Sequence, residues 1–551
     1  MMSSRPLRIV VVGGGPVAAR LVQELQPALQ AGAARVTVLG EEPIPAYQRI
    51  RLGDVASGRV DGSALAMFDP AQVDAAQGDS AQVDPAHAGR AGVEIRCGAG
   101  VVALDRDRQT VSLAEGSGPA TEIGYDRLVL ATGASAVIPD FPVSGTVGRG
   151  ISVAATADSR PEGVIALRQM HEARRLHEAV RAHEPVVVLG GGVLGVEAAL
   201  ALAEVGAEVS LLHRGPVPLG RQLDVDSGRL LHRQLVDAGV QVRPDCGIQE
   251  LVVAARAEDR ATDRDGVPHL IGIRTTQGRR IPASLLVACT GIRPRDELAA
   301  AAGLDTLPRG GIVVDRHGRC PEDPAVFAIG DCAASLGARP SGLIGPGWDQ
   351  ARAVAAVLCG EALCGEAPGS VELDAAGRPV PVPSPPPPGH RLDPIMVKSH
   401  SLSVACAGDP TVDSAADPWA PDGPHVSTWM DPGAGQYLRI VTEGDRLLGF
   451  VAIGLPRSAA ELSRHALTGT LPVADRSALL ALEHAAGDRD LGPEDVLCRC
   501  SGATCGQVED AAADCSTVDE VGRRCGAGTG CGTCRGRIEE LVARRPVGSP
   551  A

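Results

Sequence analysis

The amino-acid sequence predicts an α/β protein that contains two copies of one strand–turn–helix unit, followed by a small α+β domain and a small helical module. Three observations support this fold class. A Gly-rich turn between an apolar strand and a helix occurs twice, about 175 residues apart. A proline-rich segment separates these repeats from the rest of the chain. Two close pairs of cysteines lie near the C-terminus.

Length, composition and charge limit the classes of protein that fit. With 551 residues, 44% of them hydrophobic, the chain can bury a large core and is expected to divide into three or four domains. A formal charge of −15 makes nucleic acid and anionic membrane surfaces unfavourable partners, because both carry negative charge. No apolar run reaches the roughly eighteen residues that a membrane-spanning helix needs. A strand is predicted where the apolar region of a signal peptide would have to lie, which is evidence against a signal peptide. Most of the 15 cysteines are scattered or at metal-binding spacing, so we expect a reducing, cytoplasmic location.

The first repeat places small residues where a dinucleotide fold needs them. After the apolar strand at residues 7–12, Gly13 suits a tight turn, Gly15 lets a pyrophosphate approach the backbone, and Ala18 permits close helix–strand packing. The following helix N-terminus would face the pyrophosphate charge. The next strand ends at Glu41, whose carboxylate can accept hydrogen bonds from a ribose.

The second repeat carries Gly190, Gly192 and Gly195 in the same roles. Its second strand ends at His213 and Arg214 instead of an acidic residue. An Arg can pair with a 2′-phosphate, which a carboxylate would repel, so this position favours NADPH or mixed use. The alternative is that Arg214 points into solvent. One such fingerprint is a weak signal, but two, each between a strand and a helix, predict two Rossmann-like dinucleotide-binding domains.

Further motifs complete a flavin site. Residues 128–133 end in Ala131, Thr132 and Gly133, and residues 326–331 end in Gly330 and Asp331. Together with the two repeats, these motifs resemble the pyridine-nucleotide disulfide oxidoreductase family over roughly residues 5–360. The resemblance implies that the chain binds FAD and NAD(P)H, with Asp331 on the ribityl chain of FAD. It adds Arg49 and Trp348 to the expected FAD contacts, and Glu197 and Gly291 to the expected NAD(P)H contacts.

One feature of the disulfide reductases is missing. Their flavin passes electrons to a cysteine pair, but the first domain here has only Cys97 and the second only Cys246. The flavin therefore needs another acceptor. We assign no protein nucleophile or general base, because the flavin carries the chemistry.

The C-terminal cysteines supply that acceptor. Cys498 and Cys500 form one pair, and Cys531 and Cys534 the other. Four thiolates in two pairs can hold zinc or an iron–sulfur cluster, and the single residue inside the first pair favours the cluster. Glycines around the second pair let backbone N–H groups approach the sulfurs, namely Gly526, Gly528, Gly530 and Gly532.

Residues 496–542 resemble the bacterioferritin-associated-ferredoxin-type [2Fe–2S] module. The resemblance implies that Cys498, Cys500, Cys531 and Cys534 ligate a [2Fe–2S] cluster. Three further cysteines fall outside the pattern and are interpreted as small buried hydrophobes, namely Cys505, Cys515 and Cys525.

We therefore expect seven segments: 5–150, the first part of an FAD-binding domain; 151–277, an NAD(P)H-binding domain; 278–364, the second part of the FAD-binding domain; 365–390, a Pro-rich linker; 391–475, a reductase C-terminal α+β domain; 476–495, a linker; and 496–545, the [2Fe–2S] domain. Residues 69–90, rich in Ala, Asp, Gln and Gly, are expected to be a surface insertion.

Segments at 41–52, 220–224 and 345–351 resemble the flavin half of NAD(P)H nitrite reductase and, equally, the electron-transfer subunit of assimilatory nitrate reductase. One position departs, because Asp54 stands where ferredoxin-reductase relatives often have Lys. The resemblance implies electron transfer from NAD(P)H to FAD, to the [2Fe–2S] cluster, and on to a separate molybdenum nitrate reductase. Few residues follow Cys534, so a sirohaem module for nitrite reduction is not expected.

Two alternatives stay open. The acceptor could be a separate nitrite reductase, a ferredoxin or a rubredoxin, or the cluster module could be a sensor of redox or iron status. The assembly is expected to involve no nucleic acid and no membrane, and a homodimer is possible.

Overall fold

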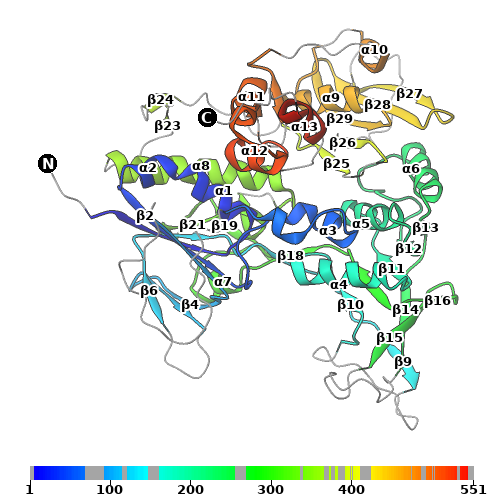
Figure 1. Ribbon diagram of the computed structural model, residues 1–551, viewed down its shortest axis with the longest axis horizontal. Coiled ribbons are helices and arrows are strands. Elements are labelled where there is room, and N and C mark those ends of the chain that lie inside the picture. Colours follow the sequence, from blue (N-terminus) through cyan, green and yellow to red (C-terminus); the bar gives the residue numbers. More distant parts are fainter. Residues whose placement is uncertain are drawn as a thin grey trace, which may run out of the picture. The chain divides into compact units, whose positions relative to one another are not determined.

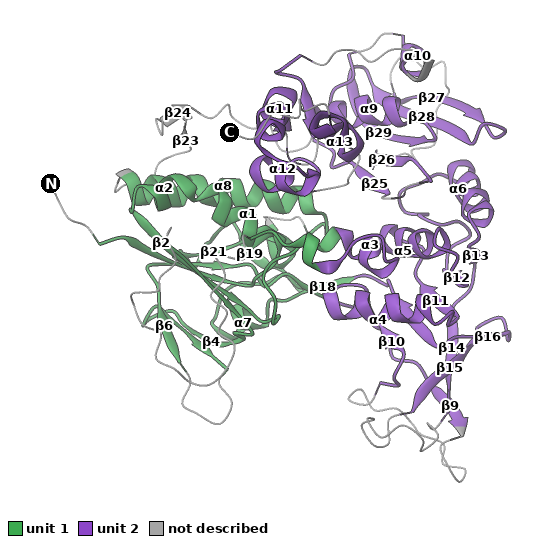
Figure 2. Cartoon of the chain, viewed as in Figure 1, with its two compact units in different colours: residues 1–50, 63–135, 292–384 green, residues 51–62, 136–291, 385–551 purple. Residues whose placement is uncertain are grey.

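The computed structural model describes residues 5–68, 92–114, 121–146, 160–254, 268–335, 339–364, 371–373, 379–381, 391–397, 399, 401–409, 423–472, 475–484, 492–498, 501, 503–529 and 534–543. The surface insertion predicted at 69–90 lies outside these residues. The chain divides into two compact units (Figure 2). The first comprises Met1–Ile50, Ser63–Ser135 and Ile292–Ser384, and the second comprises Arg51–Gly62, Ala136–Gly291 and Pro385–Ala551. Over the described residues, no helix combines the length and apolarity that crossing a membrane requires.

The first unit is built around a six-stranded sheet in the order β20-β21-β7-β1-β2-β3. Its described strands are β1 (Leu7–Val12), β2 (Ala34–Gly40), β3 (Val93–Cys97), β7 (Arg127–Leu130), β20 (Arg319–Cys320) and β21 (Asp323–Ala328). Every pairing in it is parallel except that between β20 and β21. Both faces are covered, which explains why β1 and β7 are apolar along most of their length.

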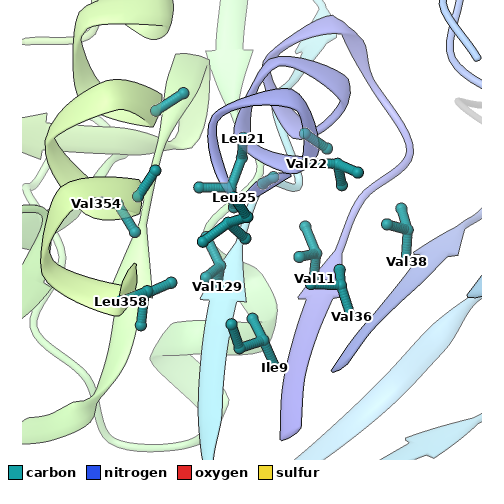
Figure 3. Close-up of a cluster of buried hydrophobic side chains, with 14 of the residues drawn as sticks. Ile9, Val11, Leu21, Val22, Leu25, Val36, Val38, Val129, Val354 and Leu358 are labelled. Atoms are coloured by element: carbon teal, nitrogen blue, oxygen red, sulfur yellow. The ribbon is translucent and has the colours of Figure 1, made fainter. Parts of the chain in front are cut away.

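Three helices cover one face of this sheet (Figure 1), namely α1 (Pro16–Glu24), α2 (Gln26–Gln30) and α8 (Ile344–Cys364). Figure 3 shows the core between them. Val11 of β1 lies beneath Leu21 and Leu25 at α1, and Val354 and Leu358 of α8 close the same cluster. All five residues are at most 1% exposed, so α1 and α8 are held to the sheet by apolar burial.

Alternate residues of β1 face a second core on the opposite side. Val10 and Val12 pack there with Leu128 of β7 and Tyr125. Smaller elements enclose this core, namely β4 (Val101–Asp105), β5 (Thr110–Leu113), β6 (Glu122–Gly124), α7 (Glu297–Ala301), β19 (Ile312–Val314) and β22 (Ala333–Ser335). The period of two along β1 thus separates the two cores.

A short ladder marks one of the places where the chain leaves the first unit and returns to it. β8 (Ala134–Ala136) pairs with β18 (Ile292–Pro294) where the unit boundaries fall. Within the range predicted as a proline-rich linker, β23 (Val371–Leu373) and β24 (Pro379–Pro381) form an antiparallel pair.

The second unit contains a second parallel sheet in the order β10-β17-β11-β12-β13. Its strands are β10 (Val164–Ile165), β11 (Val186–Leu189), β12 (Val209–Leu212), β13 (Gln241–Arg243) and β17 (Leu285–Ala288). The accompanying helices are α3 (Leu52–Ala56), α4 (Met170–Arg181), α5 (Val193–Ala203) and α6 (Val225–Asp237). A four-stranded sheet adjoins in the order β16-β15-β14-β9, with β9 (Val143–Thr146), β14 (Ile248–Ala254), β15 (His269–Thr275) and β16 (Arg280–Pro282).

A five-stranded antiparallel sheet follows in the order β25-β26-β29-β28-β27, hereafter the C-terminal sheet. Its strands are β25 (Ile395–Val397), β26 (Val404–Gly408), β27 (His425–Asp431), β28 (Gln436–Glu443) and β29 (Arg446–Ile453). α9 (Pro456–Thr468) packs on it, beginning at a proline and ending at Gly469, whose φ of +70° suits a left-handed helix cap. α10 (Ala478–His484) lies in the range predicted as a linker.

The last module is small and helical. It comprises β30 (Val496–Cys498), β31 (Ala503–Thr504), α11 (Cys505–Asp514), α12 (Val518–Cys525) and α13 (Arg535–Ala543). Thr504 and Thr517 form capping boxes with Gln507 and Glu520, which fix where α11 and α12 begin.

Candidate functional site

The parallel sheet of the first unit brings most of the predicted flavin residues to one edge. Val12 pairs with both Leu39 and Leu130, and Leu130 pairs with Ala328. The four strands therefore end level with one another. The residues that follow them leave the sheet at the same edge, namely Gly13, Glu41, the run Ala131–Gly133, and Asp331.

The two glycines of the first turn have different surroundings. Gly13 has a φ of +117°, and a Cβ there would lie 2.1 Å from the carbonyl oxygen of Ala131. Gly15 has an ordinary φ of −90° and caps α1, yet no atom lies within 4 Å of where its Cβ would be. Gly13 thus makes the tight turn, whereas Gly15 borders open space at a helix N-terminus. Such a cradle fits a pyrophosphate, and a side chain at Gly15 would fill it. Ala18 is 1% exposed on the packed side of α1.

Arg295 connects two parts of this edge, and no sequence motif pointed to it. The hydroxyl of Thr132 donates to the carbonyl oxygen of Arg295 at 2.6 Å, and the Arg295 N–H donates to Gly133 at 2.9 Å. The Arg295 guanidinium forms an ion pair with Glu41. The Glu41 side chain remains 65% exposed, so the pair leaves most of the predicted ribose ligand accessible.

Asp331 lies in the short 3-10 helix η5 (Gly330–Cys332), close to the start of α8. The Gly330 N–H donates to Oε1 of Gln350 at 2.7 Å. A Cβ on Gly347 would lie 2.8 Å from Val17 at the start of α1. The N-terminal ends of α1 and α8 therefore meet at η5, the short helix that contains Asp331.

Arg49 and Trp348 are placed differently. Arg49, in η1 (Arg49–Arg51), pairs with Glu42 at 2.5 Å and lies over the ring of Tyr47. Trp348 is 4% exposed, with the Arg20 guanidinium 5.9 Å from its ring centroid. Its indole N–H has no hydrogen-bond partner among the described residues, so it is available to an acceptor on a bound group.

The second turn repeats the geometry of the first. Gly190 has a φ of +122°, and its Cβ would lie 2.3 Å from the carbonyl oxygen of Cys289. Gly192 caps α5 at a φ of −79° with open space around its Cβ position. A Cβ on Gly195 would lie 1.9 Å from the carbonyl oxygen of Gly190, which explains why the third position needs glycine. The open position again fits a pyrophosphate. Gly291, with a φ of +117°, also borders open space.

Leu189 pairs with Leu212 and with Ala288, so His213 and Cys289 leave the second sheet beside the turn. His213 is 4% exposed, and burial holds its pKa below the usual value. It lies behind Gly191, whose Cβ would be 2.7 Å from that of His213. Arg214, the next residue, is exposed. Arg214, rather than His213, is therefore the residue free to reach a ribose substituent.

Cys289 is a residue at this edge that the sequence reasoning did not single out. Burial and the nearby carboxylates of Glu172 and Glu197 raise its pKa to about 12. The thiol is therefore protonated at neutral pH and a poor nucleophile. The usable signal was the apolar run Leu285–Ala288 directly before it, which is typical of a buried parallel strand.

In the C-terminal module the structure brings two predicted ligands together. Cys498 ends β30, is 1% exposed, and shares a core with the partly buried Cys534. Hydrogen bonding from the Cys534 thiol, followed by Ser501 and the Gly528 N–H, lowers the pKa of Cys498 to about 5 although burial opposes this. A thiolate that accepts backbone N–H groups is the donor a metal cluster requires. Cys500 and Cys531 lie outside the described residues.

The remaining cysteines of the module are packed as expected. Cys505 and Cys515 are 3% and 7% exposed, and the Cys525 thiol donates to the carbonyl oxygen of Val521 at 3.3 Å. Burial raises the pKa of Cys505 and of Cys525. These thiols therefore differ in kind from Cys498.

Two family models match the chain. Residues 7–354 match the pyridine nucleotide-disulphide oxidoreductase model, and residues 496–544 match the BFD-like [2Fe-2S] binding domain. The second match identifies the metal centre of the C-terminal module as an iron–sulfur cluster rather than zinc. With the FAD and NAD(P)H typical of the first family, the predicted cofactor set and fold class are confirmed.

Named relatives extend along nearly the whole chain. The NAD(P)H nitrite reductase of Bacillus subtilis (strain 168) is 26% identical over 97% of this chain and 57% of its own length. The assimilatory nitrate reductase electron transfer subunit of the same organism is 26% identical over 97% of this chain and 59% of its own length. The chain thus spans little more than half the length of these relatives.

A third relative and one solved structure support the family. Rhodocoxin reductase of Rhodococcus erythropolis is 31% identical over 64% of this chain and 72% of its own length. The covalent putidaredoxin reductase–putidaredoxin complex matches with a TM-score of 0.63 at 21% identity, covering 88% of this chain and 100% of that chain, and shows the fold alone. From the match over residues 7–354 and the two dinucleotide turns, we conclude that this chain belongs to the pyridine nucleotide-disulphide oxidoreductase family.

Proposed function

We propose that this chain is an FAD-dependent NAD(P)H oxidoreductase that passes electrons from NAD(P)H through FAD and a [2Fe–2S] cluster to a separate molybdenum nitrate reductase. The observation that carries the proposal is the combination of two open dinucleotide turns, at Gly15 and Gly192, with the Cys498 thiol, whose pKa is lowered by a hydrogen bond from Cys534. The sequence has no cysteine pair of the disulfide-reductase type, so the cluster is the acceptor within the chain.

We propose the following residue roles, which the open space at each turn and the resemblance to the family support. At the first turn, the space beside Gly15 takes the FAD pyrophosphate, Glu41 accepts from a ribose hydroxyl, and Asp331 contacts the ribityl chain. At the second turn, the space beside Gly192 takes the NAD(P)H pyrophosphate and Arg214 reaches the ribose. FAD, once bound, accepts two electrons together and releases them singly, which suits a one-electron cluster. The protein residues bind and orient; none acts as nucleophile or general base.

The names of two relatives support the choice of partner. One is called an electron transfer subunit of assimilatory nitrate reductase, and the other an NAD(P)H nitrite reductase. This chain covers 59% and 57% of their lengths. Our proposal assigns the catalytic site for nitrate to a separate protein, as the name of the electron transfer subunit suggests. A cytoplasmic location, a homodimer and the seven predicted domain ranges belong to the same proposal.

The test is electron delivery with and without the cluster. The chain is purified anaerobically with a candidate molybdenum nitrate reductase, and NAD(P)H-dependent nitrate reduction is measured. Cys531→Ala should abolish nitrate reduction while NAD(P)H still bleaches the flavin, because flavin reduction lies upstream. Cys505→Ser, which changes a buried cysteine outside the predicted ligand set, should leave both intact.

Two outcomes would redirect the proposal. An unchanged coupled rate in Cys531→Ala would show that electrons leave from the flavin, and the module would then be a sensor. A wild-type protein that bleaches its flavin but never reduces nitrate would point to another acceptor. The likeness to rhodocoxin reductase favours a small electron-transfer protein such as a ferredoxin or rubredoxin in that case, and a separate nitrite reductase is the other acceptor to try.

A further inference from the structure

A tyrosine of the C-terminal sheet reaches the N-terminal cap of α6, the helix that follows β12 and the loop at residues 214–224. Tyr437 of β28 is 1% exposed, and its hydroxyl donates to Oδ1 of Asp224 at 3.0 Å. The same oxygen caps α6 by accepting from the N–H groups of Asp226 at 3.0 Å and Ser227 at 3.2 Å. A helix cap needs only the backbone contacts. The hydroxyl of the buried tyrosine therefore makes a contact that the cap itself does not require, and this contact links the cap to the C-terminal sheet.

Two further contacts join the same parts of the second unit. The side-chain amide of Gln234, on α6, donates to the carbonyl oxygen of Gly435 at 2.9 Å. Glu204, at the C-terminal end of α5, accepts from the Ser399 hydroxyl at 2.9 Å and from the Ser401 N–H at 3.1 Å. The C-terminal sheet and its connecting loops thus contact α6 at Asp224 and Gln234, and the end of α5 at Glu204. The contact between Tyr437 and Asp224 adjoins the loop at residues 214–224, whereas Glu204 lies at the end of α5 opposite the turn.

The loop at residues 214–224 contacts the turn. The Leu219 N–H donates to the carbonyl oxygen of Gly191, in the turn itself, at 2.8 Å. The Leu223 N–H donates to Leu219 at 2.9 Å, and Asp224 follows directly. Leu219 has a φ of +54°, a left-handed conformation that is unfavourable for a leucine because its Cβ approaches the following carbonyl oxygen. A strained residue persists only where its surroundings fix it, and this one is 1% exposed.

We propose that Tyr437 is a positioning residue for the nicotinamide dinucleotide turn. Its bond to Asp224 fixes the start of α6, which holds the strained loop at 214–224 against Gly191. The C-terminal sheet thereby sets the fraction of molecules whose turn is ready to bind NAD(P)H. The inference rests on the proposed function in one respect, namely that the second turn binds NAD(P)H.

The consequence is a change in affinity without a change in chemistry. When a binding-competent conformation is populated only in part, the apparent dissociation constant rises in inverse proportion to that population. Tyr437→Phe keeps the ring and its packing and removes the hydroxyl alone. We expect it to raise KM for NAD(P)H by about three- to tenfold, with kcat within about twofold, using ferricyanide as the electron acceptor. Backbone amides at 215–223 should exchange hydrogen faster, with the Leu219 amide most affected.

A matched control separates this role from general docking of the C-terminal sheet. Ser401→Ala removes side-chain hydrogen bonding to Glu204, which lies at the end of α5 opposite the turn and outside the loop at residues 214–224. It should leave KM and exchange at 215–223 unchanged. Asp224→Asn retains an oxygen that can cap α6 and accept from Tyr437, and should stay closer to the wild type than Tyr437→Phe.

The results distinguish a failure of the proposed function from a failure of the positioning role. If the wild-type protein does not oxidise NAD(P)H at all, the proposed function fails. If the wild type is active and Tyr437→Phe shifts neither KM nor hydrogen exchange at 215–223, the positioning role is wrong. If Ser401→Ala and Tyr437→Phe raise KM equally, the effect belongs to docking in general, and the path through Leu219 is overturned.

Discussion

Glu41 at the end of β2 forms an ion pair with Arg295, a residue 254 positions later in the sequence. The backbone of Arg295 is fixed independently, because its carbonyl oxygen accepts from Thr132 at 2.6 Å and its N–H donates to Gly133 at 2.9 Å. The guanidinium therefore stands at a set place beside the predicted ribose ligand. We expect it to limit the conformations that Glu41 adopts before a ribose binds.

Arg295→Ala should weaken FAD retention while hardly changing stability. The Arg295 and Glu41 side chains are 38% and 65% exposed, and such pairs contribute about 0–1 kcal/mol. We expect the FAD dissociation constant, measured by fluorescence on reconstitution, to rise about threefold or more. Arg108→Ala is the control, because it breaks another exposed Arg–Glu pair, with Glu122, away from the cofactor edge. Equal effects of both variants would contradict a role for Arg295 at the ribose.

Gly15→Val should prevent flavin binding, whereas Gly192→Val should prevent only the reduction of the flavin by NAD(P)H. Both positions have ordinary φ values and open space at Cβ, so valine is compatible with the backbone and fills only the pyrophosphate path. Gly15→Val should fold but carry no flavin in a denatured extract. Gly192→Val should carry flavin that NAD(P)H no longer bleaches. Flavin retained in Gly15→Val would remove that turn from the FAD site.

Arg214→Ala should distinguish NADPH from NADH. If Arg214 pairs with the 2′-phosphate, loss of the charged hydrogen bonds should raise KM for NADPH by about ten- to a hundredfold and leave KM for NADH nearly unchanged. Arg229→Ala, which changes an exposed arginine on α6, serves as the control. Unchanged kinetics with both nucleotides would mean that Arg214 is an ordinary surface residue.

Cys534→Ser should remove the cluster, and Cys525→Ser should not. Cys534 contacts the Cys498 thiolate, whereas Cys525 donates to a backbone carbonyl and has a raised pKa. Iron and sulfide content per chain and the EPR signal of the reduced protein measure the difference. Because metal binding is coupled to folding, we also expect faster proteolysis of the module in Cys534→Ser. Stoichiometric zinc in the anaerobically purified wild type would refute the cluster assignment.

The hydrogen bonds to the Glu204 carboxylate should stabilise the protein at neutral pH and lose this effect in acid. Burial opposes the charged form of Glu204, but hydrogen bonds from Ser401, Arg59 and Ser399 lower its pKa below 4.5 overall. A carboxyl with a depressed folded pKa adds stability above its unfolded value and loses it as pH falls through the folded value. The difference in unfolding free energy between wild type and Glu204→Gln should therefore be constant from about pH 5 to 8 and shrink below about pH 4.5. Chemical denaturation at several pH values measures it, and a difference that grows in acid would contradict this sign.

Local geometry was predictable from the sequence because its signals are short in range. Gly13 and Gly190 are required by positive φ and by contact with a neighbouring strand, and spacing alone revealed both. The strands β28 and β29 and the helix α9 likewise lie within residues 391–475, the range expected to form an α+β domain. These features depend on residues that are close in the chain.

Long-range pairs were not predictable in this way. Nothing near Glu41 indicates Arg295, and nothing near Asp224 indicates Tyr437, 213 residues away. His213 shows a different limit. Its position at the strand end suggested contact with the cofactor, but the side chain is 4% exposed and lies behind Gly191, while Arg214 points outward. Which of two adjacent residues faces a ligand depends on packing that one sequence does not show.

The interrupted path of the chain through the first unit has a consequence for biosynthesis. β7 ends at Leu130, but its neighbour β21 begins only at Asp323, after the whole second parallel sheet has been made. At typical elongation rates of 5–20 residues per second, the roughly 200 intervening residues take about 10–40 s to translate. During that time the apolar edge of β7 has no strand to pair with, which makes it a site for misassociation. The nascent chain should therefore depend on chaperones until Ala328 has emerged from the ribosome.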